Sequence, residues 1–503
     1  MLRIDRESHT PLYLQIVEQI RAQVNDGTLK VGDRLPSTRE LAQQYDLHRN
    51  TICAAFEELT ANGIISSHVG KGTFIVFNPK EEIKAPTAPA PSFTHVWDRL
   101  FTGQQNEDAF TRLIAQGYPK SCISFANAVP IADLFSFRRI NKVVNEVFRE
   151  KRMELVEFGE AAGYRPLREQ LAEKMRGYGI RTDADGILIT NGVQESLTII
   201  REVLLRPGDL ALVENPTYPG ALRVFRKQGV RCVAIPVTRD GLDLEMVQSL
   251  FQHERPGLIY TTPAFHNPTG RTMSLVQRRR LLSLAYQYGV PIVEDDIYSD
   301  LRYEGHPVPS LKSMDNAGAV IYLSSFSKVG FAGLRVGWMI APRMIAERFI
   351  AAKETQDLHT NVLGQAILSE LVHGGLLTRH LKKVRLEYAM RRDGMIAALG
   401  RHFPQEATYV KPEGGMSMWI TLPPEIDAAT LLTMALQKDV VFSPGMRFYL
   451  TGGLRNTMRL TFTLKEMAKI EQGVRILGTL LKQMMLKSKQ KTAERTSYRA
   501  ALV

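Results

Sequence analysis

The sequence has few cysteines and no long apolar run. Its 503 residues include three cysteines, Cys53, Cys122 and Cys232, without the paired spacing or companion histidines of a zinc site or disulfide framework. No apolar stretch approaches the roughly 18 residues of a membrane-spanning helix, and no charged-then-apolar opening predicts export. We therefore expect neither a disulfide-stapled secreted domain nor a membrane protein, and a reducing cytoplasm fits this cysteine usage.

Positive charge is scarce in the first part of the chain. The formal net charge of +12 suggests an acidic partner such as nucleic acid. Residues 1–77, however, carry 8 Lys or Arg against 9 Asp or Glu, whereas residues 482–503 carry 6 basic residues against 1 acidic residue. We expect residues 482–503 to form a disordered basic tail with non-specific DNA affinity at most. Any DNA binding by residues 1–77 must depend on the arrangement of a few side chains.

A lysine motif is the most informative feature that is present. Lys328 ends the segment Ser324-Ser325-Phe326-Ser327-Lys328, and Arg335 follows seven residues later. A Schiff-base lysine with an aldehyde cofactor requires a short turn, and a phosphate on that cofactor requires hydroxyls and a guanidinium. Ser325, Ser327 and Arg335 supply these groups. Alone, the motif is short, and a solvated surface lysine is its ordinary interpretation.

Further motifs upstream suit the other sides of a pyridoxal ring. Asn267, in the His266–Gly270 turn, offers an amide to a ring hydroxyl. An apolar strand expected over residues 290–293 leads to Asp295, whose carboxylate can keep a pyridine nitrogen protonated so that the ring acts as an electron sink. Tyr298 is placed to donate to the ring hydroxyl. Each residue also has a structural interpretation, as helix cap or packing residue, but their combination in this order predicts a pyridoxal phosphate site.

Together these motifs resemble the fold-type I pyridoxal phosphate enzymes, the aspartate and kynurenine aminotransferase-like group, over about residues 110–480. The resemblance implies that Lys328 forms the internal aldimine, Asp295 pairs with the pyridine nitrogen, and Asn267 and Tyr298 contact the ring hydroxyl. It implies that Tyr218 stacks on the ring and Arg459 binds a substrate carboxylate. The expected phosphate contacts are Ser325, Ser327, Arg335 and the helix start at Gly192, Val193 and Gln194.

One position departs from that family pattern. The family usually has a tyrosine five residues before the glycine that is Gly163 here, and this tyrosine reaches the phosphate of the neighbouring subunit. The residue here is Phe158, which has no hydroxyl to donate. We expect weaker cofactor retention, without a change in the lysine chemistry.

The chain from Leu167 onward alternates between helical and strand patterns. Helices are expected over residues 167–175 and 275–288, and short apolar strands over 187–189, 210–213, 258–260 and 292–293. The alternation predicts an α/β main domain over residues 110–481, a mainly parallel sheet flanked by helices, with ligands at the strand ends. Residues 407–480 are expected to form a smaller mixed subdomain.

Residues 1–77 have a different pattern. We expect a helix over residues 11–24, a capped helix start over 36–42 and a third helix starting near Arg49, with Ile52, Ala55, Phe56 and Leu59 on one apolar face. Two short strands around Gly70-Lys71-Gly72 follow. This predicts a winged helix-turn-helix. Over residues 11–76 it resembles the GntR group of bacterial regulators, which implies DNA contacts by Arg39, Arg49, Asn50, Thr51, Gly70 and Lys71. The structural alternative pairs Arg39 with Glu40 or Glu58 and makes Lys71 a plain turn residue.

A proline-containing linker over residues 78–109, with a helix expected over 97–113, joins the two parts. The combination resembles the MocR subfamily of GntR-type regulators. It implies a cytoplasmic homodimer that binds operator DNA in response to pyridoxal phosphate or a small amino-compound effector. Two alternatives remain: an active aminotransferase with a DNA-binding head, and a DNA-binding protein with a vestigial scaffold.

Overall fold

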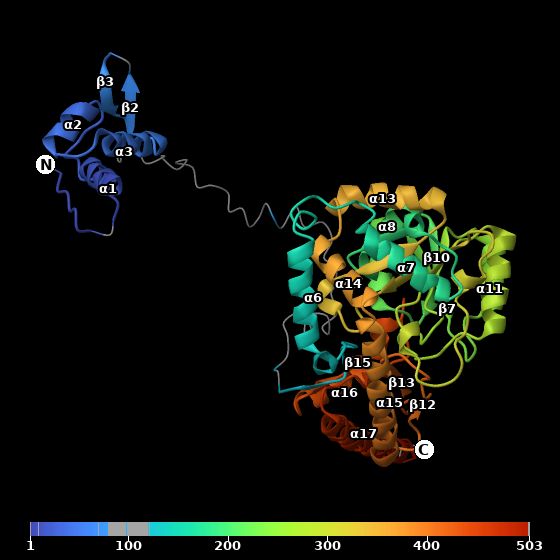
Figure 1. Cartoon of the computed structure of the whole chain (residues 1–503). Coiled ribbons are helices and arrows are strands. Elements are labelled where there is room, and N and C mark those ends of the chain that lie inside the picture. Colours follow the sequence, from blue (N-terminus) through green and yellow to red (C-terminus); the bar gives the residue numbers. More distant parts are fainter. Residues whose placement is uncertain are drawn as a thin grey trace. The chain divides into compact units, whose positions relative to one another are not determined.

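The chain forms two compact units. The computed structural model describes residues 2–8, 10–68, 70–78, 97, 119 and 121–500, with side chains up to residue 490. The units are Met1–Arg112 and Leu113–Val503 (Figure 1). No helix in these described ranges is long and apolar enough to cross a membrane. The expected linker over 78–109 and the helix over 97–113 lie outside the described residues, except for Asn78 and for Trp97, which is helical.

The first unit contains three helices and a small antiparallel sheet. The helices are α1 (Leu12–Asn25), α2 (Thr38–Gln44) and α3 (Arg49–Ala61), and the sheet has the order β1-β3-β2, with β1 (Arg34–Leu35), β2 (Ile65–His68) and β3 (Gly72–Ile75). Ser37 starts α2 through a capping box, because its side chain accepts from the Glu40 amide while Glu40 accepts from the Ser37 amide. The expected apolar face of α3 is buried against α1 and the sheet. It comprises Ile52, Ala55, Phe56 and Leu59.

A seven-stranded sheet lies at the centre of the second unit. Its order is β5 (Ile187–Thr190), β11 (Gly337–Ile340), β10 (Val320–Ser325), β9 (Ile292–Asp295), β8 (Leu258–Thr261), β6 (Leu210–Asn215) and β7 (Arg231–Pro236). β11 is antiparallel to both of its neighbours, and the remaining neighbours are parallel. This is the predicted mainly parallel α/β arrangement.

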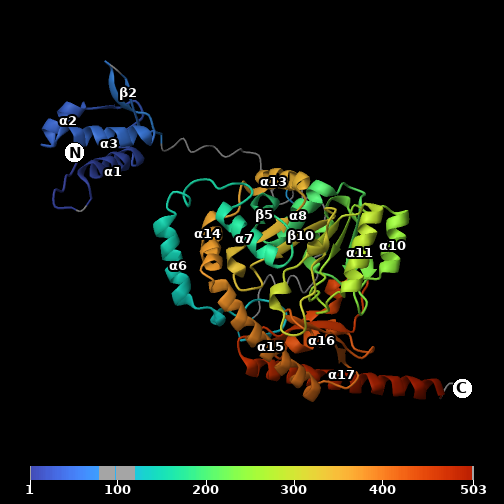
Figure 2. The ribbon, with the colours of Figure 1, turned by 45° about the vertical axis from the view of Figure 1, so that its right-hand side comes forward.

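Helices cover both faces of this sheet (Figures 1 and 2). Along β6, Ala211 and Val213 pack into one core with α8 (Val193–Leu204), α9 (Pro219–Phe225) and α13 (Arg343–Asp357). Leu210 and Leu212 pack into the other core with α10 (Leu244–His253) and α11 (Leu275–Tyr288). Successive strand side chains point to opposite faces, so a continuous apolar strand fills two cores.

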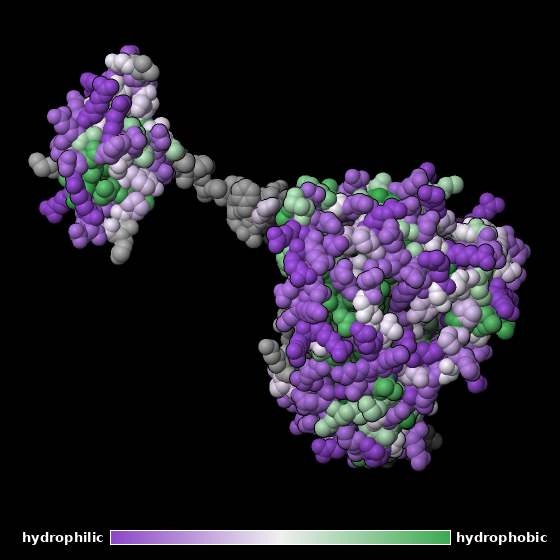
Figure 3. Space-filling model, in the orientation of Figure 1, coloured by the Kyte–Doolittle hydropathy of each residue, from purple (hydrophilic) through white to green (hydrophobic). Residues whose placement is uncertain are grey.

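The remaining elements surround this sheet and form the smaller subdomain. The other helices are α6 (Phe137–Glu150), α7 (Arg165–Gly177), α12 (Leu311–Met314), α14 (Val362–His373), α15 (Leu376–His402) and α16 (Ala428–Leu436). A four-stranded sheet has the order β12 (Thr408–Tyr409), β13 (Ser417–Thr421), β16 (Thr457–Thr461) and β15 (Ser443–Pro444), and β4 (Ile123–Ser124) pairs with β14 (Val440–Val441). Hydrophilic residues cover most of the face in Figure 3.

The C-terminal residues differ from the prediction of a disordered tail. Helix α17 (Met467–Ala500) continues through Lys482, and its end extends beyond the rest of this unit in Figure 2. Leu481 and Met485 are buried one turn apart, so the apolar periodicity of the helix crosses the expected boundary. The alanines and long straight side chains that follow favour helix by propensity.

Candidate functional site

Lys328 follows the carboxyl end of β10, near the centre of the large sheet. Its Nζ donates to the backbone carbonyl of Ala128 at 2.9 Å. Burial, reinforced by the positive charge of Arg459, lowers the pKa of Lys328 to about 8, and the carboxylate of Asp295 acts in the opposite direction. A lysine with this pKa has a much larger neutral, nucleophilic fraction near neutral pH than an ordinary lysine, although most of it is still charged there.

Asp295 ends the neighbouring strand β9 and is almost fully buried. Its Oδ2 accepts a hydrogen bond of 2.6 Å from Tyr260 Oη, whereas its Oδ1 has no partner among the described residues. Burial raises the pKa of Asp295 to about 7, and the hydrogen bond from Tyr260 counteracts this rise. A buried carboxylate oxygen without a donor is costly, so the site is shaped for a cationic or N–H partner.

A cluster of hydrogen-bond donors lies where β5 and β10 end and β11 begins. The antiparallel pairing of β11 places Gly337 opposite both Ser325 of β10 and Thr190 of β5. Arg335, just before β11, donates to Ser327 Oγ at 3.3 Å and to the carbonyl of Asn191 at 2.9 Å. Ser325 Oγ lies 3.0 Å from the Val336 carbonyl and accepts from the Ser327 amide, so it holds the turn together.

Gly192 completes this cluster as the N-cap of α8. It has a φ of 86°, and a Cβ at this position would lie 2.7 Å from the Arg335 guanidinium. The glycine therefore lets the arginine approach the helix start, where Val193 and Gln194 are the first residues of α8. Free amides at a helix start, two hydroxyls and a guanidinium form a typical phosphate-binding set.

The turn before Gly192 is held by a buried ion network that the sequence did not reveal. Asn191 Nδ2 donates to Asp357 at 2.6 Å, and the Asn191 amide donates to Glu195 at 2.6 Å. Lys353, completely buried, lies 2.5 Å from Asp357 and 3.8 Å from Glu195. The lysine thus lies between the two carboxylates that position Asn191 and reduces their mutual repulsion.

The other predicted residues are buried or partly buried in the large unit. Arg459 of β16 donates to Asn267 Oδ1 at 2.9 Å and to the Ala126 carbonyl at 2.5 Å, and its Nε has no partner among the described residues. Burial lowers the pKa of Arg459 to about 10. Tyr298 is buried, and burial raises its pKa. Tyr218 donates to Gln194 Oε1 at 3.2 Å, which links the stacking position to the phosphate-binding turn.

The assembled residues fit the group that the sequence predicts. The unpartnered Asp295 Oδ1 suits a protonated pyridine nitrogen, Lys328 suits an aldehyde, and the Ser327, Arg335 and Gly192 set suits a phosphate. Among the described residues, no group of three His, Cys, Asp or Glu side chains is placed to hold a metal ion.

Sequence reasoning missed several members of this site. Tyr260, in β8 beside β9, donates to Asp295. Its position near the carboxyl end of an apolar strand is the sequence feature from which it could have been predicted. The carbonyls of Ala126 and Ala128 contact Arg459 and Lys328, and a backbone group gives no residue-type signal. Lys353 looked like an ordinary helix residue, because burial of a charge depends on tertiary packing.

Phe158 is the position that departed from the family pattern. Its side chain is 86% exposed on the single chain, with an edge-on contact to His359. It belongs to a series of exposed apolar side chains on α6 and the segment after it: Phe137, Phe148, Met153, Val156 and Phe158.

The predicted DNA-binding residues lie on exposed parts of the first unit. Arg39 is in the first turn of α2, Arg49 and Asn50 begin α3, and Gly70 and Lys71 lie between β2 and β3; Thr51 is half-buried. The alternative ion pairs for Arg39 are not formed within the described residues, since Glu40 caps α2 and Glu58 accepts from Asn62.

Comparison with known protein families agrees with this two-part architecture. A model of class I and II aminotransferases matches residues 133–477, and a model of bacterial regulatory proteins of the gntR family matches residues 12–75. The family resemblance predicted from the sequence is therefore confirmed for both parts.

Individual relatives fall into two groups. The aromatic-amino-acid aminotransferase 1 of Thermococcus litoralis is 36% identical over 81% of this chain and 98% of its own length. The uncharacterized HTH-type transcriptional regulator YdfD of Bacillus subtilis is 31% identical over 94% of this chain and 97% of its own length. The probable rhizopine catabolism regulatory protein MocR of Rhizobium meliloti is 29% identical over 88% of each chain.

A solved structure shows the same fold for the large unit. The Pyrococcus horikoshii kynurenine aminotransferase, in complex with PMP, has a TM-score of 0.74 and 35% identity. The match covers 78% of this chain and 99% of that one.

The lowered pKa of Lys328 predicts a distinct pH dependence for its reactivity. Only the neutral amine attacks an acylating reagent, so labelling of Lys328 in the cofactor-free protein is expected to rise through pH about 8 and then level off. In Asp295→Asn the midpoint is expected at lower pH, because that carboxylate favours the charged lysine. Mass spectrometry of the labelled peptides measures both. A midpoint near the ordinary value of about 10.4 would contradict the prediction.

Proposed function

Because the chain belongs to the class I and II aminotransferases and carries a GntR-type DNA-binding domain in the arrangement of MocR, YdfD and related regulators, we propose that it is a transcription regulator whose DNA binding responds to occupancy of the Lys328 site. Its cofactor is pyridoxal 5'-phosphate. The ligand that it senses is the cofactor itself or a small amino compound that binds beside it. As a regulator of bacterial type it acts in the cytoplasm.

In this proposal, each residue of the site has a separate role in binding or orienting pyridoxal phosphate. Bound pyridoxal phosphate supplies an aldehyde and an electron-withdrawing ring. Lys328 supplies the amine, Asp295 holds the proton on the ring nitrogen, and Tyr260 fixes the orientation of Asp295. Ser327, Arg335 and the α8 start would bind the phosphate, Tyr218 would stack on the ring, and Asn267 and Tyr298 would orient its hydroxyl. Arg459 binds the carboxylate of an incoming amino compound.

One observation carries the proposed link between this site and the DNA-binding unit. Lys328 donates to Ala128, and Arg459 donates to Ala126, both in the segment that follows β4. This segment is the first described stretch of the large unit after the expected linker. With the cofactor held at Lys328, the lysine would no longer be free to donate to Ala128, and a carboxylate bound by Arg459 would compete with the Ala126 carbonyl. Occupancy therefore changes the contacts of the segment through which the chain enters the large unit.

We further propose a homodimer formed through the exposed apolar residues of α6 and the following segment. Isolated apolar residues on a surface are ordinary, but a series of five along 22 residues is typical of an interface. In this arrangement Phe158 faces the partner subunit near its phosphate site, as the family pattern implies.

Transamination is the second candidate function. Lys328, Asp295 and Arg459 together supply the nucleophile, the ring partner and the substrate anchor of an aminotransferase. Steady formation of a keto acid from an amino acid would support it. The regulator is preferred because an enzyme of metabolism has no use for residues 1–77.

Loading with pyridoxal phosphate tests the site. Wild type and Lys142→Ala, which changes an exposed lysine on α6, are expected to gain a visible absorption band, and Lys328→Ala is expected to lack it. Addition of a panel of amino compounds is expected to shift the band with the compound that is sensed. The cofactor assignment fails if wild type and Lys328→Ala give the same spectrum.

Phe158→Tyr tests the proposed dimer and the effect of having phenylalanine where the family usually has tyrosine. The added hydroxyl is expected to donate to the phosphate in the partner subunit, and a hydrogen bond to a charged group contributes about 1.5–3 kcal/mol. The dissociation constant of pyridoxal phosphate should therefore fall by roughly tenfold or more. Phe148→Tyr, another exposed phenylalanine, is the control. Equal affinities in the two variants would contradict the prediction.

Salt dependence tests the DNA-binding surface. Arg49→Gln and Arg39→Gln are expected to weaken binding to a DNA duplex, because both guanidinium groups are exposed on the recognition face. A variant that loses one phosphate contact lowers the slope of log K against log salt by about 0.9. Arg21→Gln, an exposed arginine on α1, is the control. Fluorescence anisotropy over a range of salt concentrations measures both quantities, and identical slopes and affinities in Arg49→Gln and Arg21→Gln would contradict the assignment.

A further inference from the structure

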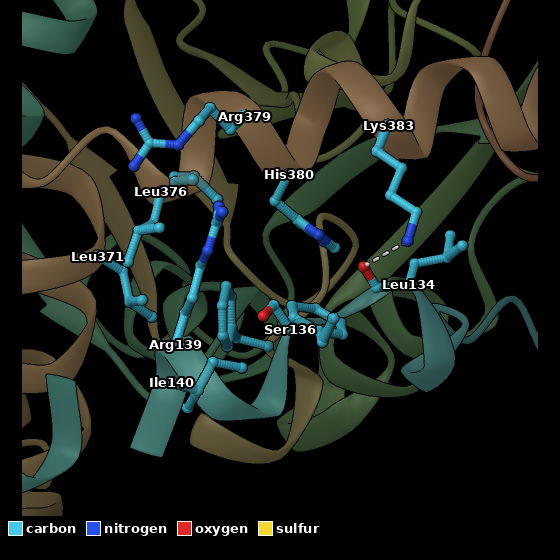
Figure 4. Close-up of a pocket in the computed structure, with 12 residues that line it drawn as sticks. Leu134, Ser136, Arg139, Ile140, Leu371, Leu376, Arg379, His380 and Lys383 are labelled. Carbon is cyan, nitrogen blue, oxygen red and sulfur yellow. Dashed lines mark hydrogen bonds between the residues drawn. The ribbon is translucent and has the colours of Figure 1, made fainter. Parts of the chain in front are cut away.

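A cavity lies between α6 and α15, and Phe331, three residues after Lys328, is part of its lining. Its volume is about 460 Å³. Figure 4 shows Arg139 pointing from α6 toward the start of α15, which carries Arg379, His380 and Lys383. None of the residues that hold the cofactor in the proposed function lines this cavity.

Three cations surround the cavity without a carboxylate. Arg379 donates to the Gly374 carbonyl at 3.1 Å, and Lys383 makes only a long contact of 3.5 Å to the Leu134 carbonyl. Arg139 is exposed, and no acidic side chain is among the described residues that line the cavity. Cations that line one cavity without an acidic residue in the same lining repel one another and attract an anion.

The inner wall of the cavity is aromatic. Phe135 stacks on His380 with ring centroids 4.0 Å apart and meets Phe331 edge-on at 4.8 Å. Burial lowers the pKa of His380, so the ring is neutral near pH 7. Its Nε2 then donates to the Val329 carbonyl at 3.0 Å. The wall offers an uncharged surface for an apolar body, next to the cations of the rim.

This wall is continuous with the turn that carries Lys328. Val329, the acceptor for His380, directly follows Lys328. Gly330 packs so closely on Phe135 that an added Cβ would lie 1.9 Å from the Phe135 ring. A group that presses on Phe135 and His380 therefore acts on the backbone at Val329 and Gly330, directly after Lys328.

We propose that the cavity between α6 and α15 binds a small organic carboxylate with an apolar body, and that its occupancy alters cofactor binding at Lys328. Arg139 and Arg379 bind the carboxylate, and Phe135, Phe331 and His380 contact the body. Because the described lining has no carboxylate to pair with an ammonium group, the ligand is an organic acid without a free amino group. This separates it from the amino compounds expected at Arg459. The binding itself does not depend on the proposed regulatory function.

Phenylacetate is a suitable probe, with acetate and phenethylamine as matched probes that lack the apolar body or the carboxylate. Isothermal titration calorimetry on the full-length, cofactor-loaded protein measures their binding. The expected result is saturable binding of phenylacetate alone, weakened roughly tenfold in Arg139→Gln and in Arg379→Gln. Arg138→Gln, an exposed neighbour on α6 that does not line the cavity, is expected to bind like wild type.

A second titration tests the link to Lys328. Phenylacetate is expected to change the dissociation constant of pyridoxal phosphate in wild type, and His380→Ala, which removes the contact to Val329, is expected to reduce that change. The cavity assignment is overturned if no saturable binding occurs, or if Arg139→Gln and Arg138→Gln bind equally. It is also overturned if Arg459→Gln abolishes binding while Arg139→Gln retains it, because the probe then occupies the cofactor site. An unchanged cofactor constant overturns the coupling alone.

Discussion

The buried carboxylate at the end of β9 is the constraint on which the large unit depends. Burial alone would keep Asp295 protonated, and its pKa of about 7 shows how closely the two states are balanced. One oxygen is held by Tyr260 and the other has no donor among the described residues. Such a carboxylate oxygen is costly without a donor, and in the proposed function the ring nitrogen of the cofactor supplies it. Lys328 and Arg459, with lowered pKa values, belong to the same balance.

The sheet positions the residues around this carboxylate. The carboxyl ends of β9 and β10 place Asp295 and Lys328 on neighbouring strands, and the antiparallel β11 returns Arg335 to the same edge. Lys353, Asp357 and Glu195 then hold the turn before Gly192, which is the proposed phosphate-binding turn. The segment after β4 is connected to both ends of the site through Ala126 and Ala128. In the proposed function, a change of occupancy acts through these two contacts on the segment after β4.

Much of this organisation follows from sequence pattern. The helix over 275–288 was predicted with the bounds that the structure has, because its apolar periodicity is regular and Ser274 and Gly289 mark its ends. The helix cap at Ser37 and the apolar face of α3 could also be predicted from the sequence. The residues with distinctive chemistry, such as Lys328, Asp295 and Arg335, were selected by motif, and the structure brings them to one sheet edge. Their roles stay a proposal.

Other features depend on tertiary packing that a sequence does not display. Tyr260 and Lys353 became visible only when neighbouring strands and helices were in place, and backbone acceptors such as the Ala128 carbonyl carry no signal of residue type. The basic residues after Lys482 suggested a disordered tail, but Leu481 and Met485 continue the buried face of α17. Composition described the charge of that segment correctly and its conformation wrongly.

The central claim is that occupancy of the Lys328 site changes DNA binding, and the affinity of the full-length protein for a selected operator duplex tests it most directly. The measurement is made at fixed salt, with and without pyridoxal phosphate, for wild type and Lys328→Ala. The account predicts that the cofactor changes the affinity of wild type by about fivefold or more, the usual range for coupled sites, and leaves that of Lys328→Ala unchanged. An operator affinity that is the same with and without cofactor in both proteins would contradict it.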